Sequence, residues 1–279
     1  MQDISIITVN FRSDDHLKHL IASVRHHLND LSWEMIVVNH DPDVSLDHLA
    51  DGNRLRVFME PNHGFAAGCN LGIKEASGKY ILLLNPDIEL VDGSVGTLLE
   101  HMDRDTKVGI AGGRLLNPDG STQPSVRRFP AVLDQLLILL KLPHVFPRLI
   151  DAYLLPHFHY EKTQDVDQVM GAFFLIRRSV IEKIGLLDQG FFYWFEEVDY
   201  CKRARDAGFV VRYYHDVLAK HMGGGSFKRV RIKDKQAVIR RSVRRYIRKH
   251  FGWRAAMLFT FANPLFWLLG RLADFFKRY

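Results

Sequence analysis

The chain has little cysteine and no long apolar run. Its two cysteines, Cys69 and Cys201, lack the spacing of a metal site or a disulfide framework, so we expect a reduced, cytosolic compartment. No uninterrupted run of about 18 apolar residues occurs, which argues against a transmembrane helix. The chain enters an apolar segment at Ile4 without a charged region and a long hydrophobic region, so we expect no signal peptide.

The composition is that of a folded protein. Hydrophobic residues make up 47% and charged residues 25% of the 279 residues, which is enough for one large or two small domains. The net charge is +6. Basic residues are concentrated between Lys228 and Arg254, where Asp234 is the one acidic residue, so the basic character belongs to the C-terminal tail.

The N-terminal half contains a series of short apolar segments, the first two of which are separated by a segment with helical spacing. The apolar segments 4–11, 34–39 and 55–59 each end in polar residues, and 14–27 carries leucine, isoleucine and valine at helical spacing. A fourth apolar segment, 80–84, has no helical period and is typical of a strand buried on both faces. This alternation predicts an α/β fold with a mostly parallel, doubly wound sheet.

The fourth apolar segment stops at Asn85, Pro86 and Asp87. Open α/β sheets bind ligands just outside the carboxyl ends of their strands, so Asp87 lies where a ligand is expected. A carboxylate on a stiff turn at this edge suits Mg²⁺ or Mn²⁺ bound to a diphosphate, because these cations prefer oxygen ligands. All three residue types also favour turns, and a simple turn is the alternative interpretation.

Small residues between 62 and 72 would let the backbone approach a ligand closely. Gly64 provides conformational freedom, and Asn62 and Asn70 are able to cap a helix or hydrogen-bond a ligand. The stretch lacks the Gly-Lys-Ser/Thr of a Walker loop, and its glycines do not fit the dinucleotide fingerprint. The alternative is a helix whose small face packs on the sheet; we expect close packing with ligand contact in addition.

A row of aromatic residues at 191–195 leads into Glu196, Glu197 and Asp199. Aromatic surroundings desolvate a carboxylate and raise its pKa toward that of a useful base, while a nearby cation acts in the opposite direction. On a helix that begins near Phe195, Glu196 and Asp199 share one side and Glu197 projects elsewhere. Negative charge in a first helical turn also suits the helix dipole, which is the structural alternative.

Together these motifs resemble the family 2 glycosyltransferases with a GT-A fold. The resemblance is carried by ITVNF, IVVN, PNHGFAAGCNLGI, YILLLNPD and FFYWFEEVDYCKRARDAG, and the LLNPD form is seen especially in the rhamnosyltransferase-like branch. It covers about residues 3–226. We therefore expect a GT-A domain at 1–226, with a nucleotide-sugar half at 1–120 and an acceptor half at 121–226, followed by a basic, amphipathic helical tail at 227–279.

The resemblance implies a donor site with a metal. Asp87 would hold Mg²⁺ or Mn²⁺ on the donor diphosphate, with Asn85 at the first position of the family's DxD motif. Asn39 stands where the family usually has an aspartate that contacts the nucleobase, with Asp41 close behind, which leaves uridine and thymidine both open. The implied donor-binding set is Val9, Asn10, Asn39, Asp41, Asn62, Gly64, Phe65, Asn70, Asn85 and Asp87.

The resemblance also implies an acceptor site and a catalytic base. Glu197 would be the base, with Glu196 as first alternative and Asp199 as an orienting or acceptor-binding residue. Arg203 would tie this helix down by ion pairing. The family counterpart of His221 lies beside the metal and diphosphate, so we predict a metal or phosphate contact. The implied acceptor-binding set is Gly171, Ala172, Trp194 and Glu196.

The predicted function is that of an inverting, metal-dependent glycosyltransferase. It would move L-rhamnose from dTDP-rhamnose onto a hydroxyl of a lipid-linked or cell-surface polysaccharide of O-antigen type. The alternatives are the same mechanism with a UDP-sugar donor, and a membrane-bound sugar-nucleotide-binding protein without catalysis. The oligomeric state stays open.

Three segments outside these motifs have two interpretations each. Arg127 and Arg128 are interpreted as solvated, with a phosphate contact as the alternative. The insertion at 132–158 is predicted to be a lid packed on the core or an amphipathic element on a membrane. The basic tail leads into the apolar stretch 255–269; each Lys or Arg near anionic lipid contributes about 1 kcal/mol. Nucleic acid is the alternative partner, but no recognised motif accompanies it, so we predict a peripheral position on the inner, cytoplasmic face of the cell membrane.

Overall fold

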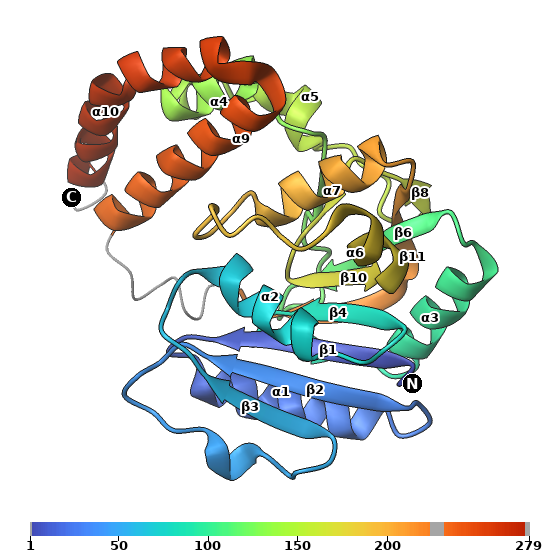
Figure 1. The fold of residues 1–279 in the computed structure, drawn as a ribbon. Coiled ribbons are helices and arrows are strands. Elements are labelled where there is room, and N and C mark those ends of the chain that lie inside the picture. Colours follow the sequence, from blue (N-terminus) through green and yellow to red (C-terminus); the bar gives the residue numbers. More distant parts are fainter. Residues whose placement is uncertain (1, 224–231, 277–279) are drawn as a thin grey trace.

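A central mixed sheet organises the protein in this computed structural model, which describes residues 2–223 and 232–276 (Figure 1). The sheet has nine strands in the described part of the chain, in the order β3-β2-β1-β4-β10-β6-β11-β5, with β8 pairing β11. Its strands are β1 (Ile4–Asn10), β2 (Trp33–Asn39), β3 (Leu55–Met59), β4 (Tyr80–Leu84), β5 (Ile88–Leu90), β6 (Val108–Leu116), β8 (Gln164–Asp165), β10 (Phe173–Arg177) and β11 (Val210–His221). A second, two-stranded sheet pairs β7 (Val126–Arg127) with β9 (Gln168–Val169).

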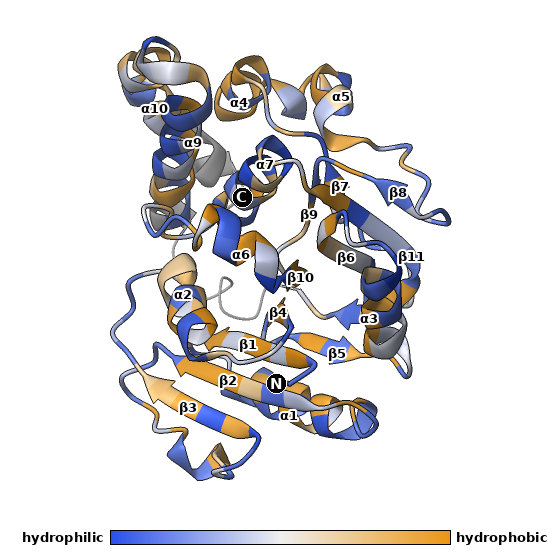
Figure 2. Cartoon of the chain, turned by 45° about the vertical axis from the view of Figure 1, so that its right-hand side comes forward, coloured by the Kyte–Doolittle hydropathy of each residue, from blue (hydrophilic) through white to orange (hydrophobic). Residues whose placement is uncertain are grey.

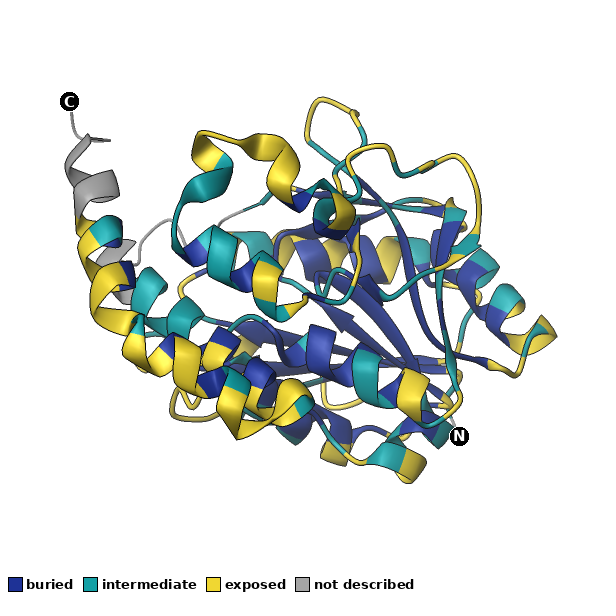
Figure 3. Cartoon of the chain, turned by 90° about the horizontal axis from the view of Figure 1, so that it is seen from above, coloured by how far each residue is buried: buried dark blue, intermediate teal, exposed yellow. Residues whose placement is uncertain are grey.

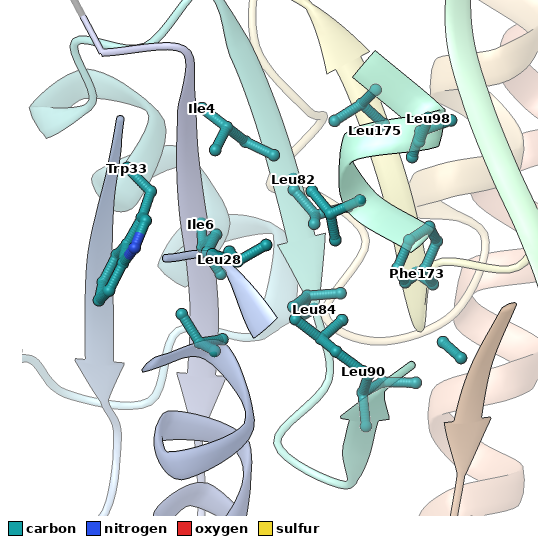
Figure 4. Packing of buried hydrophobic residues seen from close by; sticks show 14 of the residues in the cluster. Ile4, Ile6, Leu28, Trp33, Leu82, Leu84, Leu90, Leu98, Phe173 and Leu175 are labelled. Atoms are coloured by element: carbon teal, nitrogen blue, oxygen red, sulfur yellow. The ribbon is translucent and has the colours of Figure 1, made fainter. Parts of the chain in front are cut away.

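Helices cover both faces of the central sheet, as the doubly wound pattern predicts. One core cluster joins the strands to α1 (Asp14–His27) and α3 (Ser94–Arg104). Figure 4 shows part of this cluster around Leu82 and Phe173. The other cluster joins the strands to α2 (Phe65–Glu75), α6 (Arg178–Ile184) and α7 (Glu196–Asp206). β1 and β2 are correspondingly apolar along most of their length (Figure 2).

The sheet is less parallel than the sequence pattern predicts. β3, β2, β1 and β4 run parallel, but β10 is antiparallel to both of its neighbours, β4 and β6. β5 and β8 also pair antiparallel with β11. A parallel neighbour needs a crossover connection, whereas β10 enters the sheet through the turn at 170–172 in the direction opposite to β4. β6 and β11 pair in parallel. The prediction of a mostly parallel sheet is therefore correct for β1 to β4 and for the β6–β11 pair, and wrong for β5, β8 and β10.

The insertion and the tail pack on each other. The insertion forms α4 (Val132–Leu139), the 3-10 turns η2 (Leu142–His144) and η3 (Pro147–Ile150), and α5 (Asp151–Leu154); another such turn, η1 (Asp47–Leu49), precedes β3. The tail forms α9 (Ile232–Phe261), which bends at Gly252, and α10 (Asn263–Phe276). A third core cluster joins α4, α7 and α9 and includes Leu139, Val198 and Ile247. Figure 1 shows α4 and α9 side by side.

Two further points concern the tail. The predicted boundary at 226/227, and the glycine and serine residues at 224–226, lie outside the described residues. Among the residues that the structure does describe, no helix combines the length and the apolar character needed to cross a membrane.

Candidate active site

The antiparallel entry of β10 brings the predicted donor and acceptor motifs together. Phe173, the first residue of β10, lies opposite Leu84, the last residue of β4. The backbone N–H of Asn85 donates to the carbonyl oxygen of Ala172 at 3.0 Å. The turn at Gly171 and Ala172 is thereby fixed beside the end of the strand that carries Asp87, although these motifs are far apart in the sequence.

A cavity of about 530 Å³ lies at this junction. Its walls come from the ends of β4 and β11, the start of α7, the insertion and α9. The predicted site residues that line it are Phe65, Asn85, Gly171, Ala172, Trp194, Glu196, Glu197 and His221. Predicted donor and acceptor residues thus meet around one hollow.

Asp87 lies next to the cavity and faces His221. Both side chains are largely buried, and His221 Nε2 lies 3.4 Å from Asp87 Oδ1. His221 Nδ1 lies 2.7 Å from Oε1 of Gln123, whose amide nitrogen donates to Asn117 Oδ1 at 3.1 Å. Burial by itself would raise the pKa of Asp87, but the hydrogen bond and charge of His221 outweigh it and hold that pKa below its ordinary value.

The donor set at Asp87 suits a divalent cation shared with a substrate. Since Gln123 presents its carbonyl oxygen, His221 Nδ1 carries a hydrogen. Nε2 then donates to Asp87 Oδ1 when the ring is charged, and the two atoms face each other as acceptors when the ring is neutral. A cation or a second proton is needed between two such acceptors. No cluster of three or more His, Cys, Asp or Glu side chains able to hold a metal occurs in the described part of the chain. Asp87 and His221 would leave coordination positions for phosphate oxygens and water on a shared cation.

Glu196 and Glu197 begin α7 and both line the cavity. Each has a buried Oε2 atom without a hydrogen-bond partner among the described residues. Burial raises the pKa of both carboxyl groups; the charge of Glu197 raises that of Glu196 further, and the Arg127 guanidinium partly offsets the rise at Glu197. A Cβ added at Gly171 would lie 3.4 Å from Glu197 Cβ, an ordinary van der Waals distance, so this turn lies directly beside the Glu197 side chain. The sequence prediction of desolvated carboxylates agrees with this geometry.

The aromatic row is held against the loop before α2. Trp194 and Phe195 both have positive φ, 65° and 75°, a conformation that is strained for residues with a side chain. The Phe65 N–H donates to the Phe192 carbonyl at 2.9 Å, and Gly64 has φ +100° where an added Cβ would lie 2.5 Å from the Phe192 oxygen. Asn62 Oδ1 accepts from the Gly64 N–H at 3.0 Å. This loop therefore positions the start of α7.

Asn39 occupies the junction of the ends of β1 and β2. Its Oδ1 accepts from Asn10 Nδ2 at 2.9 Å and from the Asp41 N–H at 3.1 Å, and its Nδ2 donates to the Val44 carbonyl at 2.7 Å. Asn39 is fully buried, and Asn10 also donates to Asp14 at 2.8 Å. The amide of Asn39 thus holds the strand ends and the next loop in place. A base contact in this region stays a prediction.

Two other predicted donor residues have structural contacts. Asn70 Nδ2 donates to the Leu187 carbonyl at 2.8 Å, and its Oδ1 accepts from the Leu187 N–H at 3.0 Å. A Cβ added at Gly68 would lie 2.8 Å from the buried Val9 side chain, so α2 packs closely on β1. These contacts favour the close-packing interpretation of the small residues in α2.

Asp199 points away from the cavity lining toward the tail. It is fully buried and accepts from Arg203 Nε at 2.9 Å, from Lys249 Nζ at 2.9 Å and from His250 Nε2 at 2.8 Å. The predicted ion pair with Arg203 is confirmed. Burial alone would raise the pKa of Asp199, but these hydrogen bonds outweigh it and keep the pKa below its ordinary value. The geometry favours an orienting role for Asp199 over acceptor contact.

Several residues of the cavity were not singled out by sequence. Ser125, Gln135 and Tyr153 contribute to its lining. Arg127 lines it as well, and this residue is exposed, as the solvated interpretation expects. Gln123 supports His221 from a segment with no recognisable motif. None of these positions carries a local signal, because turns, an insertion helix and a short strand bring them together.

Comparison with known proteins identifies the family. Residues 5–185 match the family model described as Glycosyl transferase family 2. The chain is 27% identical over 210 residues to a low-salt glycan biosynthesis hexosyltransferase of Haloferax volcanii, covering 74% of this chain and 62% of that protein. It is 27% identical over 189 residues to an N-acetylglucosaminyl-diphospho-decaprenol L-rhamnosyltransferase of Mycobacterium tuberculosis, covering 67% and 61%. The chain thus spans about three fifths of the length of these two relatives.

Other relatives and solved structures agree in family and fold. The rhamnosyltransferase WbbL of Escherichia coli is 24% identical over 237 residues, covering 80% of this chain and 86% of that protein. The structure of GalNAc-T7 with UDP, GalNAc and Mn²⁺ matches with a TM-score of 0.60 at 14% identity, over 88% of this chain and 47% of that one. S. aureus TarS 1-349 in complex with UDP matches with 0.56 at 14% identity, over 87% and 64%. At these identities the structural likeness establishes the fold alone.

Proposed function

The chain belongs to glycosyl transferase family 2, and from this premise we propose that it transfers a sugar from a nucleotide diphosphate to an acceptor hydroxyl with inversion at the anomeric carbon. The observation that carries the proposal is one cavity lined both by Glu197, whose Oε2 has no partner within the described residues, and by His221, which faces Asp87. Such a displacement needs two parts: a desolvated base, and groups that stabilise the charge of the departing diphosphate.

Glu197 is the proposed base. Its carboxylate takes the proton of the acceptor hydroxyl as the oxygen forms a bond to the anomeric carbon, and the bond from that carbon to the diphosphate breaks. The nucleoside diphosphate leaves with the bonding electrons, so charge balances within the cavity. A raised pKa makes the Glu197 carboxylate a stronger base than that of an exposed glutamate. Glu196 is the first alternative for this role.

Asp87 and His221 are the proposed ligands of Mg²⁺ or Mn²⁺, with Asn85 beside them. A bound cation supplies charge stabilisation to the departing diphosphate. Gln123 fixes the ring of His221 so that Nε2 faces Asp87. Asp87 is in turn held by its backbone, since its carbonyl oxygen accepts from the Met222 N–H at 3.0 Å.

L-Rhamnose from dTDP-rhamnose is the proposed donor, and a lipid-linked or cell-surface glycan is the proposed acceptor. Support comes from the LLNPD motif and from the two rhamnosyltransferases among the relatives, one of which is named for a diphospho-decaprenol acceptor. A UDP-sugar is the alternative donor, because Asn39 stands where the family usually has the aspartate that contacts the nucleobase. The proposed division assigns donor binding to 1–120 and acceptor binding to 121–226.

The tail at 227–279 is the proposed membrane contact, on the cytoplasmic face of the cell membrane. Its outward side carries large exposed apolar residues, visible in yellow near the C terminus in Figure 3, which include Phe251, Trp253, Met257, Leu258, Phe261, Leu265, Trp267 and Leu268. Arg254 and Arg271 lie over the rings of Trp253 and Trp267 at 5.5 and 4.7 Å. Paired apolar and cationic groups suit the interface of an anionic bilayer.

Calorimetric titration with dTDP, UDP and GDP, with and without Mn²⁺, tests the donor half of the proposal. We expect dTDP to bind with Mn²⁺ and to lose at least about tenfold in affinity in the Asp87→Ala variant. Glu197→Gln should keep nucleotide binding and lose turnover by about 10²–10⁴-fold. Preference for UDP would change the donor. Absence of nucleotide binding under every condition would overturn the transferase assignment, and donor binding without turnover in the wild type would favour a binding protein.

A further inference from the structure

The cavity beside Glu197 holds hydrogen-bond donors that the protein itself leaves unused. Ser125 and Gln135 are 6% and 3% exposed. Ser125 Oγ and Gln135 Nε2 both lack a hydrogen-bond partner within the described residues, and both residues line the cavity. Buried polar atoms are nearly always paired in native proteins, so two unpaired donors in one hollow point to a ligand.

Arg127 adds a positive charge to the same wall. It extends from the short strand β7, two residues after Ser125, and its guanidinium lies 6.0 Å from the centre of the Tyr153 ring. Its positive charge acts to lower the pKa of the Glu197 carboxyl group and that of the Tyr153 hydroxyl group, in both cases against a larger rise from burial. Arg128, the next residue, does not line this cavity; it lines a second hollow beside Asp165 and Arg205, to which Arg127 also contributes. Of these two adjacent arginines, Arg127 therefore lines the cavity beside Glu197 and Arg128 does not.

The remainder of the cavity wall is largely apolar. It is formed by residues of the insertion and of α9, namely Ile138, Pro143, Ile150, Leu154 and Ile239. Because α9 also carries the exposed apolar surface of the tail, this wall lies on an element that leads to the proposed membrane contact. The cavity thus combines carboxylates, hydrogen-bond donors with a guanidinium, and an apolar wall.

We propose that this cavity binds the acceptor, and that Ser125, Arg127 and Gln135 bind a phosphate group that joins the acceptor sugar to an apolar chain. A guanidinium with neighbouring hydroxyl and amide donors matches the oxygens of a phosphate. A sugar hydroxyl would meet Glu197, and the apolar chain would lie along the insertion and α9. The inference rests on the proposed function and specifies its acceptor as a phosphate-linked, lipid-bearing sugar.

Equilibrium dialysis with radiolabelled farnesyl diphosphate, below its micelle concentration, tests this site. We expect the wild type to bind it, and Arg127→Ala to weaken binding by about tenfold or more. Arg128→Ala is the matched control, since it removes the same charge one residue away, and should change the affinity less than about twofold. Farnesol, which lacks the phosphates, should bind more weakly and should not respond to Arg127→Ala. Gln135→Leu, which keeps the volume of the side chain, should weaken farnesyl diphosphate binding without affecting thermal unfolding.

Nucleotide binding separates failure of this inference from failure of the transferase proposal. Arg127→Ala should leave the Mn²⁺-dependent affinity for the preferred nucleotide unchanged. Equal binding of farnesyl diphosphate by the wild type and Arg127→Ala, with nucleotide binding intact, would overturn the acceptor site alone. Equal losses of nucleotide and farnesyl diphosphate in Arg127→Ala would also overturn it, because Arg127 would then belong to the donor. Absence of nucleotide binding in the wild type would instead overturn the transferase proposal.

Discussion

Lys249 on α9 donates to Asp199 on α7 at 2.9 Å, across 50 residues of sequence. The contact places a cation of the tail on the helix that begins with Glu196 and Glu197. His250 reaches the other carboxylate oxygen at 2.8 Å. Part of the basic stretch therefore faces the protein, and the tail is tied to the element that carries the proposed base.

We expect Asp199→Asn to lower the free energy of unfolding by about 3 kcal/mol, because it leaves Arg203, Lys249 and His250 without their shared anion. The value lies at the low end for a buried pair since Lys249 is 32% exposed. Urea unfolding followed by circular dichroism measures it. Asp206→Asn on the same helix, which breaks the exposed pair with Lys202, is the control and should have an effect near zero. Equal effects of the two substitutions would contradict a structural role for the buried contact.

The same carboxylate predicts acid sensitivity. The folded-state pKa of Asp199 is depressed below the unfolded value of about 3.9, so its contribution to stability is complete above that pH and is lost as the pH falls through the folded pKa. The stability difference between the wild type and Asp199→Asn should therefore be constant from pH 7 to about 5 and shrink below about 4. Urea titrations at a series of pH values measure this difference. A difference that grew toward acid pH would assign the effect to another group.

Local sequence signals predicted the elements well where the pattern is short-range. The helix expected at 14–27 is α1, because apolar residues at helical spacing bury one face, and the strands at 34–39, 55–59 and 80–84 agree with β2, β3 and β4 within a residue. The abrupt end of β4 likewise pointed to Asp87. These features depend on periodicity and on residues adjacent in sequence.

The remaining features depend on contacts between distant segments. The direction of β10 is set by its pairing with β4 and β6, and the sequence of β10 does not predict this pairing. Asn39 resembles a ligand residue by position, yet its amide bonds to Asn10 and the next loop. Ser125 and Gln135 become a pair of unused donors only when the insertion folds over the start of α7. Such relationships require the three-dimensional structure.

Gly64 should be intolerant of a side chain. It has φ +100°, and an added Cβ would lie 2.5 Å from the Phe192 carbonyl oxygen, so Gly64→Ala combines backbone strain with a clash against backbone. Gly93→Ala is a matched control, because Gly93 has φ +71° but nothing within 4 Å of the added Cβ. We expect the control to lose about 1 kcal/mol of stability and Gly64→Ala to lose more. Thermal unfolding measures both losses of stability. Equal losses would show that the close contact between residue 64 and the Phe192 carbonyl oxygen does not limit the size of the side chain at position 64.

The exposed side of the tail should bind anionic bilayers. Replacing Trp253 and Phe261, which are 61% and 74% exposed, by serine removes apolar area while leaving the basic residues in place. We expect vesicles with phosphatidylglycerol to bind the wild type and to lose at least about tenfold in affinity for the double variant, because burial of each large side chain contributes about 1.5–3 kcal/mol. Met59→Ser, at the end of edge strand β3, is the control and should bind like the wild type. Vesicle sedimentation measures the affinity, and binding that survives in the double variant would place the contact elsewhere.

The acid limb of the pH profile should report the ionisation of Glu197. Burial raises the pKa of this carboxyl group, so kcat/KM should fall with decreasing pH at a value above the ordinary glutamate pKa of about 4.3. The Arg127 guanidinium lowers that pKa, because a positive charge stabilises the carboxylate. Arg127→Ala should therefore move the acid limb to higher pH, in addition to raising the acceptor KM.

Arg128→Ala distinguishes a local charge effect from a change in net charge. Both substitutions remove one cation, but Arg128 lies outside the cavity, so its loss should leave the acid limb in place. The measurement is kcat/KM from pH 5 to 9 for the wild type and both variants, with the nucleotide sugar that binding selects. Equal shifts in the two variants would mean that the acid limb responds to the net charge of the protein and not to Arg127 in particular. An unshifted acid limb in Arg127→Ala would argue that Glu197 is not the titrating base. A shift confined to Arg127→Ala would connect the proposed phosphate-binding arginine to the proposed base in the same cavity.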